Sequence, residues 1–317
     1  MKSRKEYIVL AVVVIVLILY LFLRHSDRTR YELPEINSLD KAEISRIAIN
    51  TPDEEIRLEK QEDRWVLMPQ GHPADDQKMN KMLDTLDDLA LTALVSESES
   101  YSRYQLADDE KILVKAWSNE QLVRALAIGK AAPSHRHTFV KLGDDPNVYH
   151  ARNNFRSRFN QSAARLRDKT VMRFKAADIK KIEIRQADKR RLISRSRHPG
   201  PSDEVSDTGS EDKALLWQDA DGNTVAAADV EELLDNLSDL QCREFIAEDR
   251  KSEFTDPIYN ITLSGKKDHT LSIFASPTEA DETYPATSAQ TQTPFYLSAH
   301  LANTIMEAID AQRMDEE

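Results

Sequence analysis

One amphipathic helix pattern occurs twice in this sequence. The stretch MNKMLDTLDDL at residues 79–89 has apolar residues at its first, fourth, fifth, eighth and eleventh positions, and VEELLDNLSDL at residues 230–240 has them at the same positions. This spacing places the apolar side chains on one side of an α-helix, with carboxylates between them facing water. Trp65 and Trp217 precede the two stretches at nearly equal distances. The repetition predicts two copies of one module in which the helix packs across a sheet. A binding groove is the alternative for the same stripe.

Strand patterns surround both helices in the same order. Each copy opens with alternating apolar residues, ISRIAI from Ile44 and IKKIEI from Ile179, and two further strand patterns follow each helix. Alternation with a period of two is typical of half-buried strands. We therefore predict an α+β fold: an N-terminal transmembrane helix followed by two tandem duplicated modules, each a mostly antiparallel sheet with packed helices. The expected modules are residues 44–175 and 176–317.

A long apolar run lies near the N-terminus. Residues 7–23, YIVLAVVVIVLILYLFL, carry no charge. At ~1.5 Å per residue, a helix over them reaches about 25 Å, close to the ~30 Å hydrocarbon core of a bilayer. The residues that follow are bulky and charged, which is untypical of a signal-peptide cleavage site. We expect a transmembrane anchor at 7–23, after a tail at 1–6 and before a polar linker at 24–43. A buried globular helix is the alternative.

The charges beside this run leave the orientation open, because three Lys or Arg residues lie close to each side of it. A large C-terminal domain is translocated largely regardless of such charges. We therefore expect a single-pass protein of the cell inner membrane with a periplasmic C-terminal domain. The single cysteine, Cys242, is compatible with an oxidising or a reducing compartment. A scaffold that faces the cytoplasm is the alternative.

Two polar insertions interrupt the second copy. Residues 194–213 and 276–293 are rich in Ser, Thr, Pro, Gly and acidic residues. Such a composition buries too little apolar surface to form a core. We expect disordered loops at both places.

The sequence contains weak candidates for a metal site and none for catalysis. The segment HRH places His135 and His137 on one side of an extended chain, and His72, Asp75 and Asp76 are conceivable partners. A polar hairpin edge that happens to contain two histidines is the alternative. We find no HExxH motif, paired-cysteine motif, nucleophile elbow or glycine-rich phosphate loop. We therefore predict no catalytic residue and no cofactor.

A basic stretch departs from the acidic composition of the whole chain, which has 43 Lys and Arg against 55 Asp and Glu. The overall balance argues against nucleic-acid binding. Between Arg152 and Arg197, sixteen Lys or Arg residues meet four acids. Phe155, Phe159, Ala163 and Leu166 have the spacing of a helix face within it. This stretch is a candidate surface for anionic lipid, an envelope polymer or an acidic partner; a solvated face that balances the acidic helices is the alternative. The candidate residues are Arg152, Arg156, Arg158, Arg165, Arg167 and Lys169.

Several short segments together resemble a bacterial domain family of unknown function that occurs in membrane-anchored proteins. They are the apolar run, RWVLMP, the acidic helix start followed by MLDTLDDL, the YQL turn, LAIG and LRDKTVMRF. Members of that family are commonly encoded beside gliding-motility-type ABC transporter components. The resemblance implies an extracytoplasmic accessory role and no established catalytic residues. The two long polar insertions depart from the family pattern.

These observations favour a membrane-anchored, non-enzymatic binding protein. We expect an assembly or partner subunit of an ABC-type transporter or envelope complex, with inner-membrane lipid and membrane proteins as its partners. A metal-dependent envelope hydrolase that uses His135 and His137 is the alternative from another class.

Overall fold

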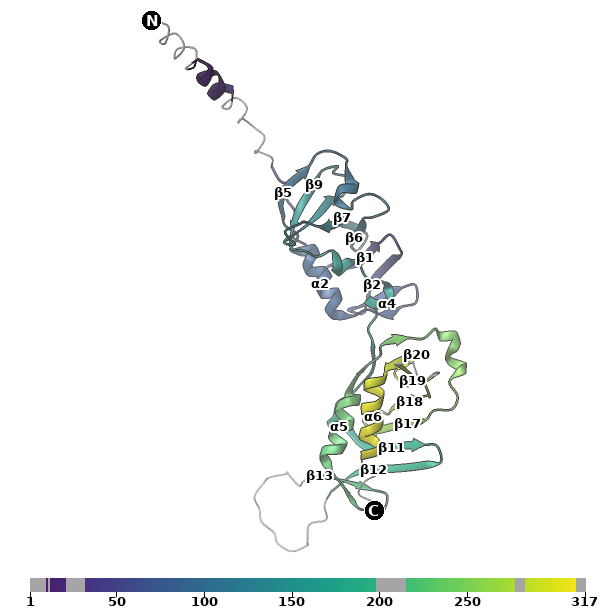
Figure 1. Ribbon diagram of the computed structural model, residues 1–317. Helices are drawn as coiled ribbons and strands as arrows, with labels where there is room; N and C mark the ends of the chain where they lie inside the picture. Colours follow the sequence, from purple (N-terminus) through teal and green to yellow (C-terminus); the bar gives the residue numbers. More distant parts are fainter. Residues whose placement is uncertain (1–9, 11, 21–31, 198–214, 277–282, 312–317) are drawn as a thin grey trace, which may run out of the picture. The chain divides into compact units, whose positions relative to one another are not determined.

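The computed structural model describes residues 10, 12–20, 32–197, 215–276 and 283–311 (Figure 1). The chain divides into two compact units, residues 1–167 and 168–317. Each unit contains one nine-stranded sheet whose paired strands are antiparallel.

The sheet of the first unit has the order β4-β3-β2-β1-β6-β7-β8-β9-β5. A short 3₁₀ segment, η1 (Tyr101–Tyr104), covers part of the face opposite the helices with a small apolar cluster around Leu106 and Phe139. The strands are β1 (Ile44–Asn50), β2 (Glu55–Gln61), β3 (Arg64–Met68), β4 (His72–Pro73), β5 (Leu91–Ser96), β6 (Ile112–Ser118), β7 (Gln121–Ala131), β8 (His137–Leu142) and β9 (Val148–Arg152).

The sheet of the second unit has the order β14-β13-β12-β11-β17-β18-β19-β20-β16. A separate two-stranded sheet joins β10 (Thr170–Arg173) to β15 (Asp239–Gln241), and two 3₁₀ segments, η2 (Ala176–Asp178) and η3 (Glu248–Glu253), complete the unit. The strands are β11 (Ile179–Gln186), β12 (Lys189–Arg197), β13 (Leu215–Asp219), β14 (Thr224–Val225), β16 (Glu244–Phe245), β17 (Tyr259–Gly265), β18 (His269–Ile273), β19 (Thr283–Ser288) and β20 (Thr291–Ser298).

The two sheets have the same topology. Position by position, β1 corresponds to β11, β2 to β12, β3 to β13, and so on to the edge strands β5 and β16. The register agrees as well: Ile47 lies opposite Leu58 in the first unit, and Ile182 lies opposite Ile193 in the second. Equivalent residues of the two modules can therefore be paired directly from the strand register.

The repeated helices are α2 (Asp76–Asp87) and α5 (Ala227–Ser238). Their apolar stripes are 0 to 6% exposed and belong to the main core of each unit. The stripe is therefore core packing in both modules. Asp75 begins α2, because its carboxylate accepts hydrogen bonds from the backbone N–H groups of Gln77 and Lys78.

The modules differ in how they end. The first closes with two short helices, α3 (Arg156–Phe159) and α4 (Ala163–Leu166), whereas the second closes with one longer helix, α6 (Ala299–Ala311), beside α5 (Figure 1). The single helix expected over the Phe155–Leu166 spacing is wrong. Ser162 has an extended backbone and accepts a hydrogen bond from the N–H of Arg165, so the chain stops and restarts between the two turns.

The transmembrane helix expected at residues 7–23 is wrong. Residue 10 and residues 12–20 are helical and exposed, and no helix among the described residues is long and apolar enough to cross a membrane. Residues 7–9, 11 and 21–23 of the expected span lie outside the described residues. The location of the chain relative to a membrane stays a prediction.

The two expected loops are partly strand. Residues 198–214 and 277–282 lie outside the described residues, but residues 194–197 belong to β12 and residues 283–288 form β19. The polar composition of β19 does not predict a strand. Within β19 the buried Ser288 donates a hydrogen bond to the carbonyl of Val171 at 2.6 Å. A buried hydroxyl with a partner is tolerated in a sheet, although the sequence pattern resembles a loop.

Candidate functional site

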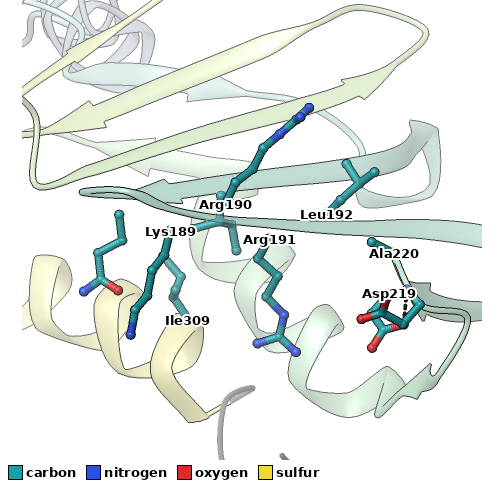
Figure 2. A pocket seen from close by; sticks show the side chains of 10 residues that line it. Lys189, Arg190, Arg191, Leu192, Asp219, Ala220 and Ile309 are labelled. Atoms are coloured by element: carbon teal, nitrogen blue, oxygen red, sulfur yellow. Dashed lines mark hydrogen bonds between the residues drawn. The ribbon is translucent and has the colours of Figure 1, made fainter.

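A pocket of 340 Å³ lies at the end of the second module where the β11–β12 hairpin, the turn after β13 and helix α6 meet (Figure 2). Figure 2 shows Lys189 and Arg191 on the helix side of β12, whereas Arg190 points to the opposite side. The lining residues are Ile184, Gln186, Lys189, Arg190, Arg191, Leu192, Asp219, Ala220, Asp221 and Ile309.

Strand alternation positions the two cations on the helix side. Successive side chains of a strand point to opposite faces, so Lys189 and Arg191 share a face with Ile193. Ile193 is fully buried in the core beneath the helices. Arg191 is half-buried and Lys189 is exposed. Along this face of β12 the side chains therefore become steadily more exposed from Ile193 to Lys189.

The equivalent positions of the first module carry different residues. Arg191 lies opposite Ile184, and the equivalent pair in the first module is Ile56 opposite Ile49. Ile56 is 2% exposed. The second module therefore has a guanidinium at a position that its duplicate fills with a buried isoleucine. Withdrawing a cation from water costs free energy unless another group compensates it.

Lys189 also has a divergent counterpart. By the same register it corresponds to Glu54, whose Oε1 accepts a hydrogen bond from the backbone N–H of Ala163 at 3.1 Å. The first module thus uses this position to hold its own closing helix α4. The second module has a lysine there, with the opposite charge.

Neighbouring arginines show what a paired cation looks like in this hairpin. Arg190 donates two hydrogen bonds to Glu183, Nε to Oε1 at 3.0 Å and Nη2 to Oε2 at 2.9 Å. Hydrogen bonds from Arg190 and Arg185 lower the pKa of Glu183 to about 2. Lys189 and Arg191, by contrast, form no ion pair or side-chain hydrogen bond with any residue that the structure describes.

Two carboxylates line the other part of the pocket. Asp219 is held by its own turn: Oδ1 accepts from the N–H groups of Asp221 (2.9 Å) and Asn223 (2.8 Å), and Oδ2 accepts from Asn223 Nδ2 (3.0 Å). These hydrogen bonds, led by the one from the Asn223 side chain, lower the pKa of Asp219. Asp221 makes no side-chain hydrogen bond or ion pair within the described ranges. The pocket therefore contains cations and carboxylates that are not paired with one another.

Two other pockets of the described chain contain internal ion pairs, although Arg64 and Asp76 of the pocket beside α2 and Glu99 of the pocket beside η1 form none. In the pocket of 660 Å³ beside α2, Lys41 pairs with Asp84 at 2.7 Å. In the pocket of 300 Å³ beside η1, Lys111 pairs with Asp108. The β11–β12 pocket is the candidate binding site because its two helix-side cations lie two residues apart on one strand and neither forms an ion pair in the described chain.

The structure does not group the histidine candidates with other possible metal ligands among the described residues. His135 is exposed in the turn before β8, and His137 on β8 stacks on His150 with ring centroids 5.4 Å apart. Asp75 serves instead as the cap of α2. Among the described residues no group of three or more His, Cys, Asp or Glu side chains is arranged to hold a metal.

The six candidate basic residues are not one open surface. Arg156 donates to the carbonyls of Ile128 (2.8 Å) and Glu110 (2.7 Å), and burial lowers its pKa. Arg158 donates to Thr85 Oγ1 at 2.7 Å, and Lys169 to the carbonyl of Arg243 at 2.5 Å. These three cations therefore act within their own modules. Arg167 is half-buried and bridges Ala74 through its backbone, and only Arg152 and Arg165 of the set are exposed.

A signal for the pocket could have been found in the sequence by aligning the two modules, although not from composition. Lys189, Arg190 and Arg191 lie in the basic stretch, but their different roles depend on which face each occupies. Aligning β12 with β2 would have placed Arg191 on Ile56. That alignment was obscured because the hairpin after β12 is longer than the one after β2.

Comparison with known proteins identifies a family but no characterised relative. The model of a family described as Domain of unknown function (DUF4340) matches residues 65–257, more than half of the chain. No curated protein matches the sequence. No solved structure matches it either. The matched range includes both repeated helices and the hairpin that carries Lys189 and Arg191.

Proposed function

The chain belongs to the DUF4340 family of domains of unknown function, and we propose that it is a non-enzymatic binding protein whose second module holds an anionic group of a ligand or partner. One observation carries the proposal: Lys189 and Arg191 line the same side of a pocket, and neither pairs with an acid of the described chain.

The position of Arg191 supports this proposal energetically. A guanidinium in a half-buried, core-facing position loses part of its hydration, and no carboxylate of the described chain compensates it. An incoming carboxylate or phosphate would provide that compensation. Arginine suits this role because its planar group can donate two parallel hydrogen bonds to such an anion. Lys189, two residues away on the same face, adds a second positive charge.

We further propose that the chain acts as an assembly or partner subunit of an ABC-type transporter. The resemblance of its short motifs to a family commonly encoded beside such transporters supports this role. The pocket would then bind either a transported small molecule or an acidic group of a transporter subunit. The proposal does not include a transmembrane helix in this chain.

The anion proposal is tested by thermal unfolding of the full chain at constant ionic strength with sodium butyrate or sodium phosphate as the probe. We expect at least one of these anions to raise the melting temperature of the wild type and to have little effect on Arg191→Ile, which copies the first module. Arg185→Gln is the matched control, because it removes an exposed cation of the neighbouring strand that pairs with Glu183 and does not line the pocket. Equal stabilisation of wild type and Arg191→Ile, or no stabilisation by either anion, would refute the proposal.

A further inference from the structure

The β11–β12 pocket is bipolar. Asp219 is the last residue of β13 and Asp221 lies in the turn that follows, whereas Lys189 and Arg191 lie on β12. All four residues line one pocket, yet no ion pair joins either cation to either carboxylate. Opposite charges in one small volume that do not neutralise one another offer separate binding points for a ligand with both charges.

We propose that this pocket binds a small zwitterion, an amino acid or short peptide with an apolar side chain. The ligand carboxylate binds Arg191 and Lys189, and the ligand ammonium binds Asp221 and Asp219. This inference rests on the proposed function, because it uses the same cations, and it adds the acidic end and the chemical class of the ligand.

The acidic end is arranged before any ligand arrives. Three hydrogen bonds from Asp221 and Asn223 fix the carboxylate of Asp219, so orienting it costs little further entropy on binding. Those same bonds keep Asp219 ionised, since they lower its pKa. Asp221 has no side-chain partner in the described chain and supplies a second acceptor for an ammonium group.

The size and lining of the pocket favour a small and partly apolar ligand. Its volume of 340 Å³ is at the lower end of the ~300 to 1,000 Å³ that small-molecule sites occupy. Ile184, Ala220 and Ile309 contribute apolar surface between the charged residues. Ile184 and Ile309 are 3% and 4% exposed, so they belong to the rigid core rather than to a mobile rim.

A purely anionic ligand fits this lining less well. Two carboxylates in the pocket repel a second negative charge, which disfavours phosphate monoesters and dicarboxylates relative to a zwitterion. A cation alone is disfavoured for the same reason by Lys189 and Arg191. Arg190 also lines the pocket, but it is paired with Glu183. The two unpaired cations and the two carboxylates therefore favour a ligand with one charge of each sign.

The test is calorimetric titration of the full chain with four probes: leucine, leucyl-leucine, N-acetyl-leucine and leucinamide. N-acetyl-leucine lacks the ammonium and leucinamide lacks the carboxylate. We expect leucine or leucyl-leucine to bind about tenfold or more tightly than either blocked probe, the difference that one charged hydrogen bond typically makes. Failure of both zwitterions to bind more tightly than N-acetyl-leucine would overturn the inference.

Two variants separate this inference from the proposed function. Asp221→Asn should weaken binding of the zwitterion about tenfold and leave N-acetyl-leucine unchanged. Asp188→Asn is the control, because it removes an exposed acid from the neighbouring turn that does not line the pocket. If N-acetyl-leucine binds as well as leucine and Arg191→Ile abolishes both, the anion site stands and the zwitterion inference falls. If no probe binds the wild type, the inference falls as well.

Discussion

Replacing Arg191 by isoleucine should stabilise the second module while removing its anion site. The first module carries isoleucine at the equivalent position, where Ile56 is 2% exposed. Full burial of an isoleucine side chain contributes ~1.5 to 3 kcal/mol. Position 191 is only half-buried because one side of it faces the pocket. We therefore take about half of that range and expect Arg191→Ile to raise the free energy of unfolding by about 1 kcal/mol.

Urea denaturation followed by far-ultraviolet circular dichroism measures this change. The transition that reports the second module is identified independently as the one that Leu237→Ala lowers. The control is Arg190→Ile, at an exposed position where arginine pairs with Glu183; it should bring no gain in stability. A loss of stability in Arg191→Ile would refute the reasoning, because it would mean that the arginine is a structural residue whose contacts outweigh its burial.

Three further predictions concern the fold. Leu86→Ala and Leu237→Ala remove equivalent, fully buried residues of the two helix stripes, and each should lower the free energy of unfolding of its own module by ~2 to 5 kcal/mol in urea titrations; no change in either would contradict core packing. Asp75→Ala removes the carboxylate that caps α2 and should destabilise the first module by ~0.5 to 2 kcal/mol, whereas Asp75→Asn should recover most of that loss. The carboxyl of Glu183 has its pKa lowered to about 2 in the folded state from an ordinary 4.5. Its contribution to the free energy of unfolding is therefore complete above pH 4.5 and is lost as the pH falls toward 2. Acid titration should show a weaker pH dependence of the free energy of unfolding in Arg190→Gln, and an identical dependence would contradict this pairing.

The repeated helix was readable from the sequence because its physics is local. Apolar residues three and four positions apart define one helix face without knowledge of the rest of the chain. Residues 79–89 and 230–240 overlap α2 and α5, and each stripe lies in the core of its unit. The opening strands at Ile44 and Ile179 were legible for the same reason, since alternation is also a local pattern.

Features that depend on tertiary context were not readable. Strand β19 contains small and polar residues, and its burial follows from pairing with β18 and β20 rather than from its own composition. The transmembrane expectation considered only the length of an apolar run. Counting charges makes the basic stretch a candidate surface, but charge counts do not reveal that Arg156 and Arg158 donate to groups within the first module.

The candidate pocket could not be predicted from the sequence for a related reason. Its residues come from a hairpin, a distant turn and the terminal helix, which only the fold brings together. The significance of Arg191 arises from comparison with Ile56, and that comparison requires the register of both sheets. A residue that breaks the pattern of its own module is visible only once the pattern is known.

The two modules differ at the end of the sheet that forms the pocket. In the first module, Glu54 accepts a hydrogen bond from Ala163 and Ile56 is buried, so this end of the sheet holds its own closing segment. In the second module, the equivalent positions are Lys189 and Arg191, both of which line an open pocket. At both positions the first module has a residue that serves its own fold, and the second module has a cation that does not pair within the described chain. The two differences lie two residues apart on one strand face and have the same sign of charge, as the proposed anion site requires.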